Sequence, residues 1–321
     1  MINQLVNQLV NLHPLIFHSI IALASLIILA KSAGLVVYGI SDYAKKLGVS
    51  DYLIGFLVVS IGTAIPELVA SLTGALVNQG EIVFGTVLGS NLFKIPLLGL
   101  ILLIAKNIRI RENVGMNAPI VTLFVTTLPL LLIIDGVLSK IEGAILIIAF
   151  LIYIARLWQG EGQLGKMEKK VELKKVWKDA LIFILALVAL LLSARFLVFS
   201  SISVSEILNI SPYIIGLIVI GVGASAPEIT IQIRSIFKHH QDIAFGNVLG
   251  SFVANSALVL GIVALIKPVY IKPSTIFVTS IFMIAGTLYT LIIMGKERVN
   301  WKHGLVLISF YIVFLIAEWI F

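Results

Sequence analysis

The chain has 321 residues, of which 60% are hydrophobic and 12% are charged, and its mean hydropathy is +1.11. A soluble domain of this composition would expose large apolar faces to water, so we exclude that class and predict an integral membrane protein. The absence of cysteine excludes disulfides and thiolate metal sites. A net charge of +7 would suggest nucleic acid in a soluble protein. In a membrane protein we interpret the basic residues as markers of cytoplasmic loops, and we expect no nucleic-acid partner.

Apolar segments of about 20 residues or more follow one another along the chain, and each is long enough to cross a hydrocarbon core of about 30 Å. We therefore predict an all-α integral membrane protein with ten transmembrane helices. The predicted spans are 14–42, 50–78, 82–105, 115–134, 139–158, 178–202, 211–237, 243–266, 274–294 and 302–320.

The basic residues predict the orientation of these spans. With the N-terminus outside, 17 of the 23 Lys and Arg residues fall in cytoplasmic connections and three fall outside, while Lys31, Lys94 and Arg195 lie inside spans. Cytoplasmic loops of membrane proteins carry the excess of Lys and Arg. We therefore expect a multi-pass protein of the cell membrane with both termini extracellular.

The most charged linker, 159–177, divides the chain into halves 1–158 and 178–321 of five spans each, which together form one membrane domain. The sequence offset that takes Glu67 to Glu228 aligns residues 32–90 with residues 193–251 without a gap. Because five is odd, the second copy enters the membrane from the opposite side. Inverted repeats of this kind are typical of secondary transporters, whose site lies near the midplane where the repeats meet. The offset aligns Ser32-Ala33 with Ser193-Ala194, Gly62 with Gly223, Pro66-Glu67 with Pro227-Glu228, and Leu88-Gly89-Ser90 with Leu249-Gly250-Ser251.

Two glutamates, Glu67 and Glu228, each follow a proline inside a long apolar run. A charged side chain at the bilayer centre costs roughly 2.5–3.5 kcal/mol on insertion scales, so we interpret both acids as functional. Proline removes a backbone donor and interrupts the helix at that point. We therefore predict two broken helices that contribute their carboxylates to one cation site.

A second glycine-containing segment follows each broken helix. Ser90 and Lys94 are four residues apart, as are Ser251 and Asn255, so each pair shares a helical face. Hydroxyls, carboxylates and freed backbone carbonyls form an oxygen-only site, which suits hard cations such as Ca²⁺ and Na⁺. The alternative is that the glycines serve helix packing and the serines bond to their own helices.

The motifs Gly62–Glu67 with Gly85–Asn91, and Gly223–Glu228 with Gly246–Ser251, resemble the two alpha repeats of the cation/calcium antiporters, in the prokaryotic type of the sodium/calcium exchanger branch. The resemblance implies a secondary active antiporter that exports Ca²⁺ in exchange for Na⁺ by alternating access, and not an enzyme. The first and sixth helices would slide against the other eight. The expected partners are the bilayer and inorganic cations, with no cofactor and no obligate protein partner.

The resemblance also implies roles for individual residues. Glu67 and Glu228 match shared Ca²⁺ and Na⁺ ligands. The backbone carbonyls of Thr63 and Ala224 match further Ca²⁺ donors. The hydroxyls at flanking Na⁺ sites match Ser90, Ser225 and Ser251.

The sequence departs from the family pattern at four positions. Ala64 and Ala224 stand where the family usually has Ser and Thr, and Lys94 stands where Asn or Asp is common. Asn255, which we keep as a candidate ligand, replaces an Asp. The formal charge of the site changes from −3 to −1. We hypothesise that Lys94 fills one coupling-ion position, so that fewer Na⁺ are exchanged per Ca²⁺ or a proton leaving Lys94 takes part. The alternative is that Lys94 points away and snorkels.

Other functional classes fit the sequence less closely. An H⁺-coupled Ca²⁺/cation exchanger of the same superfamily is the nearest alternative. An intramembrane protease needs paired aspartates or a Ser with His, whereas no Asp lies deep in a predicted span and only His18 is near a span interior. A passive channel fits inverted repeats with midplane carboxylates less well than alternating access does.

Overall fold

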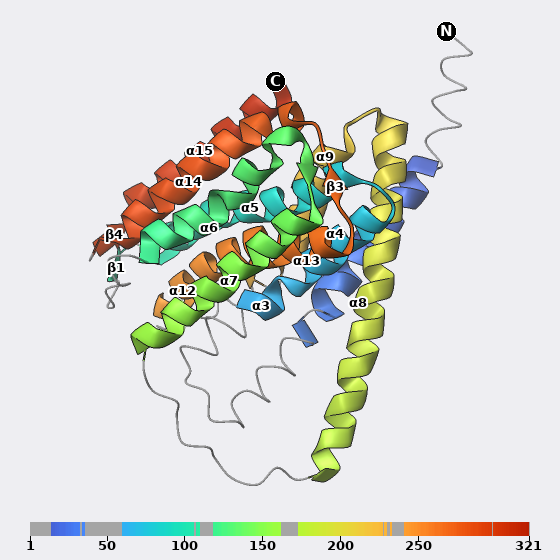
Figure 1. Ribbon diagram of the computed structural model, residues 1–321, viewed down its shortest axis with the longest axis horizontal. Helices are drawn as coiled ribbons and strands as arrows, with labels where there is room; N and C mark the ends of the chain where they lie inside the picture. Colours follow the sequence, from blue (N-terminus) through green and yellow to red (C-terminus); the bar gives the residue numbers. More distant parts are fainter. Residues whose placement is uncertain are drawn as a thin grey trace.

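Figure 1 shows the computed structural model of the chain. Pro227 of the second Pro-Glu pair lies outside the described residues, as do parts of the predicted spans 14–42 and 50–78 and the middle of the linker 159–177. The predictions made for those segments stay predictions. The structure describes residues 14–32, 34–35, 60–105, 107–109, 118–161, 173–226, 228–229, 232, 241–296 and 298–320.

Helices make up most of the described chain, in agreement with the predicted class. One helix covers Pro14–Ser32. The π-helical segments are η3 (Gly216–Ile220) and η4 (Ala254–Val259), and the 3₁₀ segments are η2 (Ile133–Asp135) and η5 (Pro273–Ile276). The remaining α-helices are α3 (Ser60–Thr63), α4 (Ile65–Leu76), α5 (Gly80–Ala105), α6 (Ala118–Leu132), α7 (Lys140–Glu161), α8 (Leu173–Leu208), α9 (Pro212–Ile215), α10 (Gly221–Ala224), α12 (Gln241–Val253), α13 (Leu260–Ile266), α14 (Phe277–Met294) and α15 (Trp301–Ile320).

Short strands are a departure from the predicted all-α fold. Strand β1 (Asn107–Arg109) pairs antiparallel with β4 (Arg298–Asn300), with Ile108 opposite Val299. Strand β2 (Val137–Leu138) pairs antiparallel with β3 (Val269–Tyr270). Strands this short cannot show a period of two in the sequence, so no pattern indicated them. Each pair joins a connection of the first half to one of the second.

Six of the described helices are long and apolar enough to cross a bilayer, and three shorter apolar helices accompany them. Large apolar side chains on these helices face outward, such as Ile20, Phe196 and Ile292, which are 62%, 53% and 53% exposed. Water would not tolerate so many, whereas lipid does. The protein is therefore a multi-pass membrane protein. The six are Pro14–Ser32, Gly80–Ile104, Ile184–Leu208, Asn247–Ile266, Pro273–Met294 and Trp301–Ile320, and the shorter three are Ile65–Leu76, Ile120–Asp135 and Pro212–Ala224.

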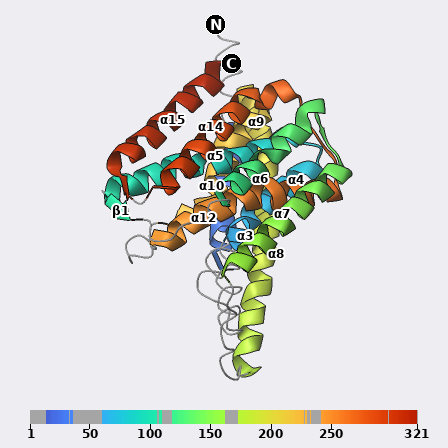
Figure 2. The same cartoon turned by 60° about the vertical axis from the view of Figure 1, so that its left-hand side comes forward.

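Helix α8 is longer than the predicted span 178–202. At about 1.5 Å per residue its 36 residues extend about 54 Å, well beyond a hydrocarbon core of about 30 Å. Figures 1 and 2 both show its N-terminal end projecting past the other described helices. That end carries the basic residues Lys174, Lys175 and Lys178, so the helix continues into the charged linker.

Two helical rods lie at the centre of the structure and hold the polar residues of interest. These are the apolar helical stretches Gly80–Ile104 and Asn247–Ile266. The most apolar part of the first is 72% buried and that of the second 78%, whereas that of Trp301–Ile320 is only 17% buried. Helix α5 contacts α4, the α9–η3–α10 segment, α14 and α15. The central rods thus have neighbours on several sides, and polar groups along them are shielded from lipid.

The close approach of α5 to η3 requires glycine. A Cβ atom at Gly89 would overlap the carbonyl oxygen of Leu217, and one at Gly85 would overlap the carbonyl oxygen of Tyr213. Small residues allow two helix backbones to touch in this way. The contact fixes α5 against the chain that leads to Ser225, and so sets the distance between the two halves of the site.

The helices are interrupted near both glutamates. A turn at Ala64 separates α3 from α4, and Pro66 stands at the start of α4, where its missing N–H is tolerated. In the second half α10 ends at Ala224 and a turn follows at Ser225. The first interruption therefore comes at Ala64, before the proline, rather than at the proline itself as the sequence suggested.

Candidate cation site

Glu67 and Glu228 belong to one buried cluster. Glu67 lies in the first turn of α4, and Glu228 follows the turn at Ser225. Glu67 interacts electrostatically with both Glu228 and Lys94. None of the three side chains has exposed surface. The fold therefore brings two acids and one base, from both halves of the sequence, into the same dry region.

Ser90 is the centre of a hydrogen-bond network around Glu67. Its Oγ donates to Oε1 of Glu67 at 2.7 Å and lies 2.8 Å from Oγ of Ser225. Nδ2 of Asn255 donates to Ser90 Oγ at 3.0 Å, and Ser225 Oγ lies 3.5 Å from Glu67 Oε1. The four residues come from α4, α5, the turn after α10, and η4. Both halves of the chain therefore build this part of the site.

Lys94 is paired with the second acid. Its Nζ lies 3.4 Å from Oε1 of Glu228 and 3.5 Å from Oδ1 of Asn91. Lys94 is fully buried, so the alternative in which it snorkels to the membrane surface is wrong. A buried ammonium needs a partner of this kind, because removing it from water is costly.

Several oxygen atoms of the cluster retain unused acceptor capacity. Thr63, Ser251 and Lys94 all approach the Glu228 carboxylate. Even so, no well-aligned hydrogen bond from the described residues reaches Oε2 of Glu228, Oε2 of Glu67 or Oδ1 of Asn255. Buried oxygens normally have a partner, and a bound cation satisfies such oxygens.

Two of the candidate serines bond to their own helices, and this does not prevent them from serving as cation ligands. Ser251 Oγ donates to the Asn247 carbonyl of its own helix at 2.6 Å, and Ser225 Oγ donates to the Gly221 carbonyl at 2.9 Å. A hydroxyl oxygen used as a donor keeps its lone pairs, so back-bonding leaves a cation ligand available. Ala224 places its methyl group in an apolar cluster beside Ser225, and the role of its carbonyl stays a prediction.

The sequence interpretation gave no role to the contact between Asn91 and Ser256. Nδ2 of Asn91 donates to Oγ of Ser256 at 2.9 Å, and both side chains are buried. Asn91 follows Ser90 directly in the recognised motif. Ser256 lies in η4, and the π-helical register there could not be read from the residue pattern.

The chemistry of the cluster is that of a small oxygen-lined cation site. The cluster offers carboxylate, hydroxyl and amide oxygens, which are the donors that hard cations prefer. Two carboxylates and one ammonium give a formal charge of −1 (−2 + 1). A site with this charge attracts cations less strongly than one with three carboxylates.

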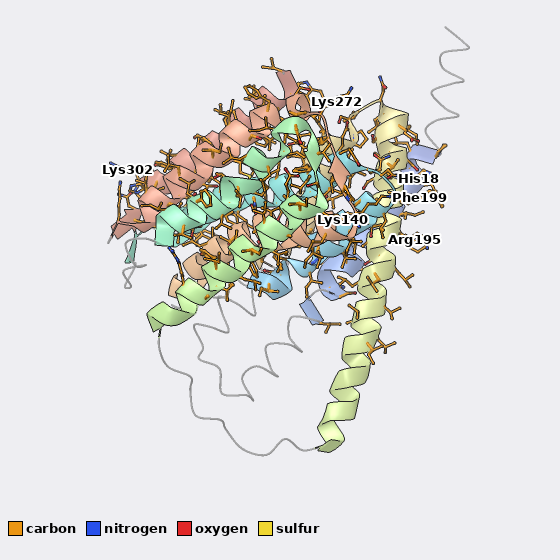
Figure 3. The ribbon with its side chains drawn as sticks, in the orientation of Figure 1. His18, Lys140, Arg195, Phe199, Lys272 and Lys302 are labelled. Atoms are coloured by element: carbon orange, nitrogen blue, oxygen red, sulfur yellow. The ribbon has the colours of Figure 1, made fainter. Side chains whose placement is uncertain are left out.

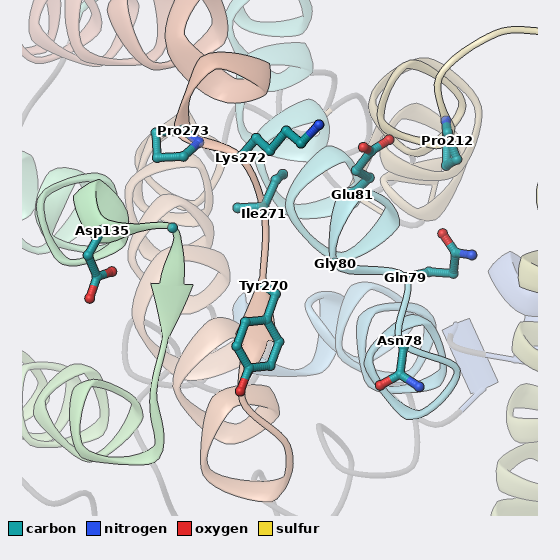
Figure 4. A pocket seen from close by; sticks show the side chains of 11 residues that line it. Asn78, Gln79, Gly80, Glu81, Asp135, Pro212, Tyr270, Ile271, Lys272 and Pro273 are labelled. Atoms are coloured by element: carbon teal, nitrogen blue, oxygen red, sulfur yellow. The ribbon is translucent and has the colours of Figure 1, made fainter.

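A separate cavity of about 570 Å³ opens at one end of the bundle. It includes Glu81, whose Oε2 accepts a hydrogen bond from Ser211 at 2.8 Å, and its rim carries Asp135 and Lys272 (Figure 4). The residues of the buried cluster do not line it. The buried site and this surface hollow are thus different features. The lining consists of Asn78, Gln79, Gly80, Glu81, Asp135, Gly136, Pro212, Tyr270, Ile271, Lys272 and Pro273.

Comparison with known proteins identifies the family. The sodium/calcium exchanger protein family matches residues 17–159 and 178–320, one match in each half. The chain is 30% identical over 307 residues to CaxA of Alkalimonas amylolytica, covering 92% of this chain and 96% of that protein. It is 28% identical over 341 residues to the sodium/calcium exchanger MaX1 of Methanosarcina acetivorans, covering 93% and 97%.

Solved structures share the fold. The sodium-calcium exchanger NCX_Mj superimposes with a TM-score of 0.65 at 24% identity, over 93% of this chain and 98% of that one. The H⁺/Ca²⁺ exchanger CAX superimposes with a TM-score of 0.75 at 17% identity, over 93% and 82%. With a family match in each half and a buried pair of glutamates from both halves, the chain belongs to the sodium/calcium exchanger family of membrane antiporters.

Proposed function

We propose that the protein is a secondary active antiporter that exports Ca²⁺ in exchange for Na⁺ by alternating access. The observation that carries the proposal is the burial of Glu67 and Glu228 in one cluster with unused oxygen atoms. Mid-membrane carboxylates contributed by two related halves suit a site that opens to each side in turn. Transport of inorganic cations needs no cofactor and no obligate protein partner beyond the bilayer.

We also propose the architecture that this mechanism needs: ten transmembrane helices as two inverted repeats of five, with both termini extracellular. The gap-free alignment of residues 32–90 with residues 193–251 and the bias of basic residues between loops support it. In the same orientation the surface cavity beside Glu81 faces the outside. Its lining comes from connections that the sequence assigns to that side.

The moving parts in this proposal are the helix Pro14–Ser32 and α8. The rings of His18 and Phe199 make an edge contact with centroids 5.8 Å apart, which joins these two helices (Figure 3). Their apolar residues, such as Leu29 and Leu197, belong to a cluster separate from the main core. Because this cluster is small and is separate from the main core, the two helices can slide against the remaining bundle while the main core stays packed.

Within the site, Glu67 and Glu228 act as shared Ca²⁺ and Na⁺ ligands in our proposal. The carbonyls of Thr63 and Ala224 complete the Ca²⁺ shell. Flanking Na⁺ positions use oxygen atoms of Ser90, Ser225, Ser251 and Asn255. The supporting contacts are those that join Ser90 to Glu67, Ser225 and Asn255.

Lys94 has a separate role in the proposal, that of a tethered cation at one coupling position. Its pairing with Glu228 at 3.4 Å supports this role, because the ammonium neutralises a carboxylate that would otherwise attract an ion. Fewer Na⁺ then accompany each Ca²⁺. If the ammonium releases its proton during the cycle, the proton joins the coupling.

An H⁺-coupled Ca²⁺/cation exchanger is the second candidate. The specific observation in its favour is the buried, titratable Lys94 in direct contact with a site carboxylate. In this variant of the proposal, proton movement between Lys94 and the solvent replaces Na⁺ movement.

Ion flux into proteoliposomes distinguishes the two candidates. Purified protein is reconstituted, and uptake of labelled Ca²⁺ is measured with a Na⁺ gradient at equal pH, and then with a pH gradient in the absence of Na⁺. The proposal expects uptake with the Na⁺ gradient. Uptake with the pH gradient alone favours the second candidate, and uptake with neither gradient contradicts both.

A further inference from the structure

Asn91 connects Lys94 to the opposite half of the site. Its Nδ2 donates to Oγ of Ser256 at 2.9 Å, and its Oδ1 lies 3.5 Å from Nζ of Lys94. Asn91 is 1% exposed, whereas Ser256 and Lys94 are completely buried. The amide therefore bridges η4 and the ammonium without any access to solvent.

The orientation of the amide follows from its two neighbours. An ammonium only donates hydrogen bonds, so it requires the oxygen end of the amide. A reversed amide would place NH₂ against NH₃⁺ and would leave the ammonium with Glu228 alone. The Ser256 hydroxyl can donate or accept, and with the oxygen end held toward Lys94 it accepts from the NH₂ end. The lysine thus fixes the orientation of the amide, and the serine anchors its other end.

The position of Asn91 then determines which of the two glutamates Lys94 pairs with. Asn91 and Lys94 are three residues apart on α5 and share a helical face. Lys94 Nζ contacts both Oδ1 of Asn91 and Oε1 of Glu228. Glu67, in contrast, accepts a hydrogen bond at Oε1 from Ser90, and its Oε2 has no hydrogen-bond partner among the described residues.

The arrangement breaks the symmetry of the halves. At the offset that relates the two Pro-Glu pairs, Asn91 corresponds to Phe252 and Lys94 corresponds to Asn255. The second half therefore has neither the ammonium nor the amide that faces it. The π-helical segment η4 brings two consecutive residues toward α5, since Asn255 bonds to Ser90 and Ser256 bonds to Asn91. A π segment inside a helix often marks a functional site.

We propose that Asn91, anchored by Ser256, is the positioning residue that holds Lys94 against Glu228 and leaves Glu67 as the site carboxylate without a fixed counter-charge. This inference rests on the proposed function and assigns unequal roles to the two glutamates. Without the Asn91 oxygen, the long side chain of Lys94 is free to approach Glu67, where it competes with the incoming cation.

A double-mutant cycle on transport tests the inference. Asn91→Ala is made in the wild-type background and in the Lys94→Asn background, and Ca²⁺ uptake is measured against Ca²⁺ concentration. In the wild-type background we expect the KM for Ca²⁺ to rise about tenfold with little change in maximal rate, and in the Lys94→Asn background less than about twofold. Equal rises in the two backgrounds would overturn the inference, because a purely structural role for Asn91 does not depend on Lys94.

Two further variants keep the test decisive. Ser256→Ala removes the hydroxyl that anchors the NH₂ end of the amide, and it is expected to raise KM in the same lysine-dependent way if Asn91→Ala does not assemble. Thr290→Ala is the matched control, because it removes a buried hydroxyl that bonds to Gly286 of its own helix. The control is expected to leave KM within about twofold of wild type.

The same cycle can be measured without transport. Thermal unfolding in detergent is compared for wild type, Asn91→Ala, Lys94→Asn and the double variant. Non-additive shifts of Tm are expected, and additive shifts would overturn the contact. If wild type takes up no Ca²⁺ with either gradient, the proposed function fails, and the unfolding cycle still decides whether Asn91 and Lys94 are coupled.

Discussion

Nζ of Lys94 lies 3.4 Å from Oε1 of Glu228, and neither side chain has any exposed surface. A family that moves cations through its core therefore has, in this member, a positive charge covalently fixed inside the site. The amino group that carries the charge cannot leave with the transported ion. Its partner, Glu228, corresponds by the repeat alignment to Glu67, which has no such pairing among the described residues. The two acids are therefore not equivalent in this structure.

Removal of one partner of the pair should destabilise the protein. Glu228→Gln leaves the ammonium of Lys94 buried beside a neutral amide, and loss of one member of a buried ion pair costs about 3–5 kcal/mol. We expect a clearly lower Tm in detergent. Removal of both charges in Glu228→Gln/Lys94→Met should restore most of the loss. A double variant as unstable as Glu228→Gln would show that the charge is not the cause.

Replacement of the tethered charge should change the coupling. Lys94→Asn removes the ammonium, which makes the formal charge of the site more negative by one and opens a position to a mobile ion. We expect about one additional Na⁺ per Ca²⁺, in accordance with the charge removed. The measurement is the membrane voltage at which Ca²⁺ flux reverses under fixed Na⁺ and Ca²⁺ gradients. An unchanged reversal voltage would remove Lys94 from the coupling mechanism.

Restoring a carboxylate at Asn255 should strengthen cation binding. Oδ1 of Asn255 has no hydrogen-bond partner among the described residues, while its Nδ2 donates to Ser90. Asn255→Asp adds a negative charge at this point and replaces the amide donor with a second carboxylate oxygen. We expect the Ca²⁺ concentration for half-maximal binding to fall about tenfold, as measured by calorimetric titration. Asn255→Leu serves as the opposite control and should weaken binding.

Substitution of Gly89 by any larger residue should disrupt the contact between α5 and η3. A Cβ at Gly89 would overlap the carbonyl oxygen of Leu217, whereas one at Gly295 would have its nearest neighbour at 3.6 Å. Overpacking of this kind typically costs about 1–3 kcal/mol. Gly89→Ala is therefore expected to lower Tm and to slow Ca²⁺ uptake, and Gly295→Ala is expected to behave as wild type. Equal Tm values for the two variants would contradict the packing that sets the width of the site.

The sequence predicted the helical membrane class and the positions of most helices, because long apolar runs leave few other structures. It also predicted that Glu67 and Glu228 contribute to one site, since a buried carboxylate in a membrane has a high energetic cost and is therefore interpreted as functional. Residue order alone did not indicate the length of α8. Its first turns are charged and carry no apolar signal, and helix formation there continues beyond the hydrophobic stretch.

The finer contacts of the site depend on three-dimensional packing. Ser90 pairs with Asn255, and Asn91 pairs with Ser256. The repeat alignment instead matches Ser90 with Ser251 and Asn91 with Phe252, so it does not predict these pairs. They arise because η4 changes the helical register and because glycines let α5 approach its neighbours closely.

In our proposal Glu67 exchanges the transported cation, and uptake of labelled Ca²⁺ by Na⁺-loaded proteoliposomes measures this exchange. Wild type is compared with Glu67→Gln and with a matched control, Glu318→Gln, which removes an acid of α15 that accepts a hydrogen bond from Thr279. We expect Ca²⁺ accumulation by wild type and by the control, and a loss of at least about 100-fold for Glu67→Gln. Near-normal accumulation by Glu67→Gln would show that this carboxylate does not exchange the ion.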